Sequence, residues 1–162
     1  MSGRSGAGPA LLVAVAATGV GLVGLLGACN RPLFDRALPA IERVNPNIPG
    51  GRFQVLASIA GGDARIDFQV SVTVRQQLQD SGFTVVRRAG RWDSQTEAVR
   101  ILCEPPVNGV LFIWYNRLEL RDCVTEGGMA YEITSRGQEG ITHLTDRLIR
   151  YLRSPAPPAP SQ

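Results

Sequence analysis

The sequence predicts an α/β fold in which helices cover a mixed sheet, with the elements in the order β-α-β-α-β-β-α. Two observations support this prediction. Three segments repeat apolar residues three or four positions apart, as one-faced helices do, and four others are β-branched runs or alternate apolar with polar residues. A helix with one apolar stripe needs a sheet to cover, so we expect an α/β sandwich over residues 52–153.

The first half of this domain is predicted to hold two strands around a helix. Residues 52–59 form a short strand, and residues 64–81 form a helix that Asp63 is placed to cap. The apolar face of the helix advances in steps of four, through Ile66, Val70, Val74 and Leu78. Gly82 lies where a left-handed residue commonly ends a helix, and residues 83–87 follow as a β-branched strand.

The second half is predicted to hold a helix, two strands and a last helix. Ser94 and Glu97 have the spacing of a capping box, and the helix that they open ends before Pro105. Residues 107–122 have the strongest strand pattern, and their apolar start suits a central strand. Residues 129–134 return as a hairpin partner. Residues 140–153 form a helix with one apolar face, made by Ile141, Leu144, Leu148 and Leu152.

The first 28 residues have the features of an export signal. Arg4 precedes an uncharged apolar run over residues 10–26, and two small residues follow. A membrane-spanning helix is the alternative, but spanning takes about 20 mostly apolar residues, and this run is shorter and contains glycines. The pattern favours a signal peptide over residues 1–28.

The run ends in Leu26-Gly27-Ala28-Cys29, which resembles the lipobox of bacterial lipoproteins. The resemblance implies cleavage between Ala28 and Cys29 and a diacylglycerol on the Cys29 thiol. With a second acyl signal, such a group holds a protein stably on a membrane. Asn30 follows where an aspartate would favour the inner membrane. We therefore expect a periplasm-facing lipoprotein, with the outer membrane favoured.

Both ends of the mature chain are rich in proline. Residues 29–51 contain Pro32, Pro39, Pro46 and Pro49, and are predicted to be an extended tether. Residues 154–162 are of low complexity and are predicted to be a disordered or polyproline-like tail.

A second resemblance covers residues 53–152. The helix that ends in Asp80-Ser81-Gly82-Phe83, the strand after it and the hairpin segment Leu118–Asp122 resemble envelope modules, namely the amino-terminal domain of TolB and the lipoproteins LpoB and CsgG. This resemblance implies binding to other envelope proteins and carries over no catalytic residues.

No catalytic, cofactor or metal constellation is recognisable in the sequence. His143, the single histidine, has no nucleophile or further ligands near it in sequence. Gly61, Gly62 and Asp63 lack the spacing of a phosphate-binding loop. The 17 basic residues are all arginine and are interleaved with acidic ones, which argues against a nucleic-acid-binding face. We expect neither an enzyme nor a bound cofactor.

Cys103 and Cys123 form a possible disulfide. An oxidising compartment favours a bond, but the α-carbons must approach to within about 6 Å. A straight strand over residues 110–122 would span roughly 40 Å and exclude the bond. A sharp bend at Asn116–Arg117 would allow it. The sequence leaves both outcomes open.

Three functions fit these observations to different degrees. A non-catalytic protein-binding module of the envelope is favoured, with Trp92 in a loop-like stretch, or an open sheet edge, as a possible partner contact. A small-ligand or lipid-binding lipoprotein is the alternative, and a pocket of several hundred Å³ would favour it. A hydrolase with an unfamiliar site is the third.

Overall fold

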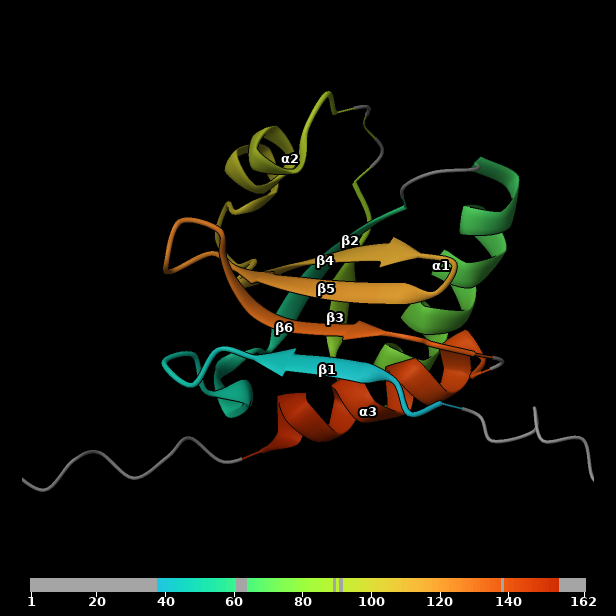
Figure 1. Ribbon diagram of the computed structural model, residues 1–162. Helices are drawn as coiled ribbons and strands as arrows, with labels where there is room; N and C mark the ends of the chain where they lie inside the picture. Colours follow the sequence, from blue (N-terminus) through green and yellow to red (C-terminus); the bar gives the residue numbers. More distant parts are fainter. Residues whose placement is uncertain (1–37, 61–63, 89, 91, 138, 155–162) are drawn as a thin grey trace, which may run out of the picture. The chain divides into compact units, whose positions relative to one another are not determined.

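A six-stranded mixed sheet with three helices on its two faces forms the centre of the structure (Figure 1). The computed structural model describes residues 38–60, 64–88, 90, 92–137 and 139–154. The α/β class predicted from the sequence is confirmed. The predicted signal peptide, the lipidation site Cys29, the Asp63 cap and residues 155–162 of the predicted tail lie outside the described residues.

The strands lie in the order β1-β6-β5-β4-β2-β3. Strand β2 is parallel to β3 and β4, and the other neighbouring pairs are antiparallel. The strands are β1 (Ile41–Val44), β2 (Val55–Ala60), β3 (Thr84–Val86), β4 (Gly109–Trp114), β5 (Arg117–Asp122) and β6 (Gly128–Thr134). The helices are α1 (Ala64–Asp80), α2 (Gln95–Leu102) and α3 (Ile141–Arg153), and one 3-10 turn, η1, covers Gly50–Arg52.

The predicted helix-end signals act largely as expected. At the end of α1, Gly82 has a φ of 90° and donates to the Gln79 carbonyl at 2.9 Å, and Phe83 donates to the Leu78 carbonyl at 3.0 Å. This is the Schellman pattern that a C′ glycine permits. At the start of α2, the Ser94 hydroxyl accepts the Glu97 N–H at 3.1 Å. The Glu97 carboxylate accepts the N–H of Asp93, one residue before the partner of an ideal capping box.

The predicted tether over residues 29–51 extends too far into the folded domain. Its residues 41–44 form β1, which pairs with β6, and Ile48 is buried in the core. A strand can form in this proline-rich segment because Pro39 and Pro46 lie on either side of it and do not interrupt it. An edge strand also needs only one of its two rows of backbone groups for pairing. The folded domain therefore begins before residue 52.

The predicted strand over residues 107–122 is two strands. The chain reverses at Tyr115–Asn116, and β4 and β5 pair as an antiparallel hairpin from Gly109–Asp122 to Trp114–Arg117. The reversal lies within one residue of the bend that the sequence left open. The apolar start is central as predicted, because β4 lies between β5 and β2 and its first five residues are buried.

The two faces of the sheet are covered differently. Helices α1 and α3 cover the face that we call the inner face, on which Leu111, Leu118 and Leu120 are fully buried. Helix α2 covers only the part of the outer face formed by β2 and β4, around Ala57, Val110 and Phe112. No described helix covers the outer face of β5, β6 and β1.

Candidate functional site

A disulfide joins Cys103 to Cys123. Their α-carbons are 5.3 Å apart and 20 positions separate them in the chain. Cys103 caps the C-terminus of α2, and Cys123 follows β5 directly. The β4–β5 hairpin brings the two together, so the bond ties the short helix to the end of the sheet. Of the straight and bent arrangements that the sequence left open, the structure has the bent one, which allows the disulfide.

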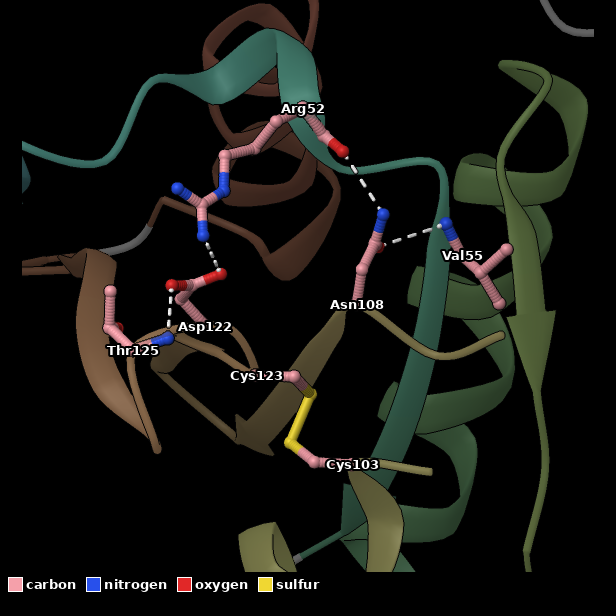
Figure 2. The surroundings of a disulfide bond; sticks show 7 residues. All are labelled: Arg52, Val55, Cys103, Asn108, Asp122, Cys123 and Thr125. Atoms are coloured by element: carbon pink, nitrogen blue, oxygen red, sulfur yellow. Dashed lines mark hydrogen bonds and ion pairs between the residues drawn. A yellow bond between two sulfur atoms is a disulfide. The ribbon is translucent and has the colours of Figure 1, made fainter. Parts of the chain in front are cut away.

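A cluster of buried and partly buried polar side chains lies beside the disulfide (Figure 2). Asp122 is fully buried, accepts from Arg52 at 2.5 Å and also accepts the Thr125 N–H at 2.9 Å. The Asn108 amide donates to the Arg52 carbonyl at 3.0 Å and accepts the Val55 N–H at 3.2 Å. Because each polar group has a partner within the domain, this cluster has a structural role, holding η1, β2 and the β5–β6 turn together.

Trp92 packs against the apolar cluster that α2 covers on the outer face. Its side chain is half-buried and packs on the cluster formed by residues such as Ala98, Leu102 and Phe112. It is therefore not a freely exposed loop tryptophan, although part of its surface remains accessible. A partner contact through Trp92 stays a prediction.

An open groove runs between the β1 edge and α3, with a volume of about 610 Å³. We call it the β1–α3 groove. One wall is made by β1 and the loop after it, including Glu42, Val44 and Pro46, and the other by α3, including His143, Arg147 and Arg150. Figure 1 shows β1 and α3 side by side. The walls come from segments about 100 residues apart, so no local sequence pattern predicts the groove.

Two tyrosines hold the walls of the groove together. The Tyr151 hydroxyl donates to the Ile48 carbonyl at 2.7 Å, and the Tyr151 ring stacks on Tyr131 with centroids 4.6 Å apart. Gly50 allows the close approach, because a Cβ there would lie 1.8 Å from the Tyr151 carbonyl oxygen. Burial raises the pKa of Tyr151 to about 12. The groove is therefore a fixed feature of the packed domain.

The charges of the groove are only partly balanced. The Tyr131 hydroxyl donates to one Glu42 oxygen at 2.7 Å, and Arg147 forms an ion pair with the other. Burial, followed by the hydrogen bond to Glu42, raises the pKa of Tyr131, and the same carboxylate raises the pKa of Arg147. Arg150 is exposed and forms no ion pair with another described residue. The groove thus retains a positive charge that can attract an anion.

The uncovered outer face carries paired charges. Glu119, only 1% exposed, lies between Arg117 and Arg121 on β5 and forms an ion pair with each. Arg117 also pairs with Glu132 at 3.1 Å and lies over the Trp114 ring at 4.8 Å. These charges satisfy one another within the sheet, so this face offers less free charge than the groove.

The remaining predicted features are placed as follows. His143 is an exposed residue at the rim of the β1–α3 groove, 3.8 Å from Glu139. Within the described ranges, no group of three or more histidine, cysteine or acidic residues is arranged to hold a metal ion. None of the helices that the structure describes is both long and apolar enough to cross a membrane.

Comparison with known proteins finds likeness among solved structures but no sequence relative. No family model and no curated protein matches the sequence. Among solved structures, a PelC dodecamer from Paraburkholderia phytofirmans is similar, with a TM-score of 0.42 and 18% sequence identity over 71% of this chain and 95% of that chain. A likeness of this degree assigns neither a family nor an activity to the chain.

Proposed function

We propose that the chain is a lipid-anchored protein of the bacterial cell envelope that acts as a non-catalytic protein-binding module. The observation that carries the proposal is the segment Leu26-Gly27-Ala28-Cys29 at the end of an uncharged apolar run. Cleavage before Cys29 and lipidation of its thiol would place the folded domain at a membrane surface, facing the periplasm, with the outer membrane favoured by Asn30.

The disulfide supports an exported location. Disulfides persist in oxidising compartments such as the bacterial periplasm and are rare in the cytosol. The bond between Cys103 and Cys123 is consistent with a domain that folds after export. It also leaves Cys29 as the one cysteine of the three available for acylation.

Metabolic labelling tests the anchor. Cells that express the chain are grown with an alkyne-bearing fatty acid, and the protein is then examined for the label. We expect Cys29→Ser to abolish labelling and membrane association, and the double variant Cys103→Ser/Cys123→Ser to retain both. Unchanged labelling of Cys29→Ser would refute lipidation at this cysteine.

Cross-linking in intact cells, followed by mass spectrometry, tests the binding role. We expect cross-links from the lipidated protein to at least one other envelope protein, and loss of those cross-links in Cys29→Ser. Recovery of the chain alone, with an efficient cross-linker and gentle extraction, would refute a binding module.

A second candidate is favoured by the volume of the β1–α3 groove. About 610 Å³ is within the range of small-ligand sites, so a ligand-binding lipoprotein is the alternative. The open, charged groove suits an anionic ligand better than an apolar lipid tail, which needs an enclosed apolar cavity. Native mass spectrometry of gently extracted protein distinguishes the two, because only the alternative predicts a co-purifying small-molecule mass.

A further inference from the structure

We propose that β1 and the β1–α3 groove together bind an extended, acidic segment of a partner protein, which adds to the sheet as a seventh strand. The inference rests on the proposed role as a protein-binding module and names the surface and the chemistry of the partner segment. It follows from two independent features at the same place, an open sheet edge and an excess of positive charge.

The backbone of β1 has a free row of hydrogen-bonding groups. Strand β1 is the last strand in the sheet order and pairs only with β6. Asn45 donates to the Ala130 carbonyl at 3.0 Å, so Asn45 and, by strand alternation, Arg43 direct their backbone groups towards β6. Glu42 and Val44 therefore direct theirs away from it, where no described strand pairs with them. These groups form a template for strand addition.

The side chains of an added strand would reach the groove. Successive side chains of a strand point to opposite faces, so every second residue of the added segment would lie on the same face as Glu42 and Val44. That face adjoins α3, whose His143, Arg147 and Arg150 line the groove. Val44, 47% exposed, offers an apolar contact beside these charges.

The charge of the groove selects an acidic segment. Arg147 is already paired with Glu42, whereas the exposed Arg150 makes no ion pair within the part of the chain that the structure describes. A carboxylate at alternate positions of the added strand would meet Arg150 and reinforce the field at Arg147. A second copy of this chain fits less well, because antiparallel pairing of two β1 edges would bring two positive grooves together.

Synthetic peptides test the inference with the full chain purified in mild detergent. The probe is a fluorescent peptide, acetyl-Thr-Glu-Val-Glu-Val-Glu-Thr-amide, which places its three glutamates on one face of a strand. One comparison peptide carries lysine in place of each glutamate, and another carries proline in place of each valine. Fluorescence anisotropy measures affinity, and amide shifts in the isotope-labelled protein locate the site.

We expect the glutamate peptide to bind at least about tenfold more tightly than either comparison peptide, with the largest amide shifts at Glu42 and Val44. Equal binding of the glutamate and lysine peptides would overturn the acidic specificity. Tight binding of the proline peptide, or shifts confined to another surface, would overturn strand addition. Absence of binding by the glutamate peptide would overturn the inference as a whole.

Two variants separate the edge from the charge. Val44→Pro removes a backbone donor that faces away from β6 and leaves the β1–β6 hydrogen bonds intact, and Val44→Thr is its matched control. Arg150→Glu reverses the unpaired charge, and Arg136→Glu makes the same change at an exposed arginine outside the groove. We expect Val44→Pro and Arg150→Glu each to weaken binding about tenfold or more, and both controls to bind like the wild type.

Failure of this inference is distinguishable from failure of the proposed function. If the glutamate peptide does not bind but cross-links in cells map to another surface, such as α2 or the outer face of β5, the binding module stands and the β1 site is wrong. If Cys29→Ser is still labelled and no partner is captured, the proposed function itself is wrong.

Discussion

The inner and outer faces of the same sheet are stabilised in different ways. On the inner face, α1 and α3 bury an extended apolar cluster. On the outer face, the eight-residue α2 covers a smaller cluster and is bonded to the sheet through Cys103–Cys123. The rest of the outer face has paired charges around Glu119. The comparison indicates that a covalent bond and ion pairs compensate where a long apolar helix is absent.

Removal of apolar volume from the inner face should have the largest effect on stability. Leu148 of α3 is fully buried, and we expect Leu148→Ala to lower the free energy of unfolding by about 4 kcal/mol, because a cavity replaces the leucine. The matched change Leu102→Ala on α2 should cost about 2 kcal/mol, since the smaller cluster can collapse around it. Urea unfolding followed by circular dichroism measures both. An equal cost at the two sites would refute the contrast.

Loss of the disulfide should destabilise the α2 side specifically. For a loop closed over 20 positions, we expect Cys103→Ser/Cys123→Ser to cost about 3 kcal/mol, because the unfolded chain regains the freedom that the bond removed. Hydrogen exchange should rise in α2 well before it rises in α3. Equal protection of both helices after reduction would show that α2 does not depend on the bond.

The charged part of the outer face should be less sensitive. Glu119→Gln removes the buried carboxylate between Arg117 and Arg121, which are partly exposed and can regain water. We expect a loss of about 2 kcal/mol, measured by urea unfolding. Arg43→Gln on the same face should change stability by less than about 0.5 kcal/mol, because the Arg43 side chain that pairs with Glu132 is largely exposed. A Glu119→Gln protein as stable as the wild type would show that the ion pairs are dispensable.

An effect at neutral pH smaller than that of Glu119→Gln should come from a tyrosine hydroxyl on the inner face. Tyr151→Phe removes the hydrogen bond to Ile48 and should cost about 1 kcal/mol. The variant should differ more clearly from the wild type in how its stability depends on pH in alkaline solution. Burial holds the pKa of Tyr151 at about 12 in the folded protein, above the ordinary value of 10.0. The unfolded chain therefore ionises first, and the stability that this hydroxyl provides, complete below pH 10, is lost as the pH rises through 12.

Urea unfolding at several pH values between 9 and 12 checks this expectation. Stability of the wild type should fall more steeply than that of Tyr151→Phe over this interval. Tyr131, whose pKa is also raised by burial, should contribute in the same direction and keep some pH dependence in the variant. The same slope in both proteins would refute a role for Tyr151 in alkaline unfolding.

Local patterns were sufficient to predict the helices and most strands. The four-residue steps of α1, with Gly82 after it, and the Ser94–Glu97 spacing at α2 are signals that the chain carries within one or two turns. Val70, Val74 and Leu78 are buried as predicted. These elements were predictable because their own residues determine both the periodicity and the ends.

Features that depend on distant residues were not predictable from local patterns. Strand β1 has four residues, two of them charged, and is a strand because it pairs with β6, about 90 residues away. The disulfide could not be predicted because it requires the chain to turn at Tyr115–Asn116, which brings Cys123 back to Cys103. Leu118 and Leu120 alternate with charged residues in β5, but this pattern does not indicate that Glu119 is buried and paired with Arg117 and Arg121.

The β1–α3 groove was missed for the same reason. Glu42 lies in the predicted tether and Arg150 in the last predicted helix, and only the closure of the sheet brings them to one groove. The sequence predicted a partner contact at an open sheet edge, but it did not indicate which edge of the sheet.

The disulfide also changes what a protease can achieve. The ring that it closes contains the whole β4–β5 hairpin, whose tip residue Tyr115 is 71% exposed and is an accessible cleavage site. A cut at that tip would separate the backbone into two pieces that stay covalently joined through sulfur and paired through the remaining strands. The nicked molecule would keep its intact mass, apart from one added water, until a reductant released the fragments.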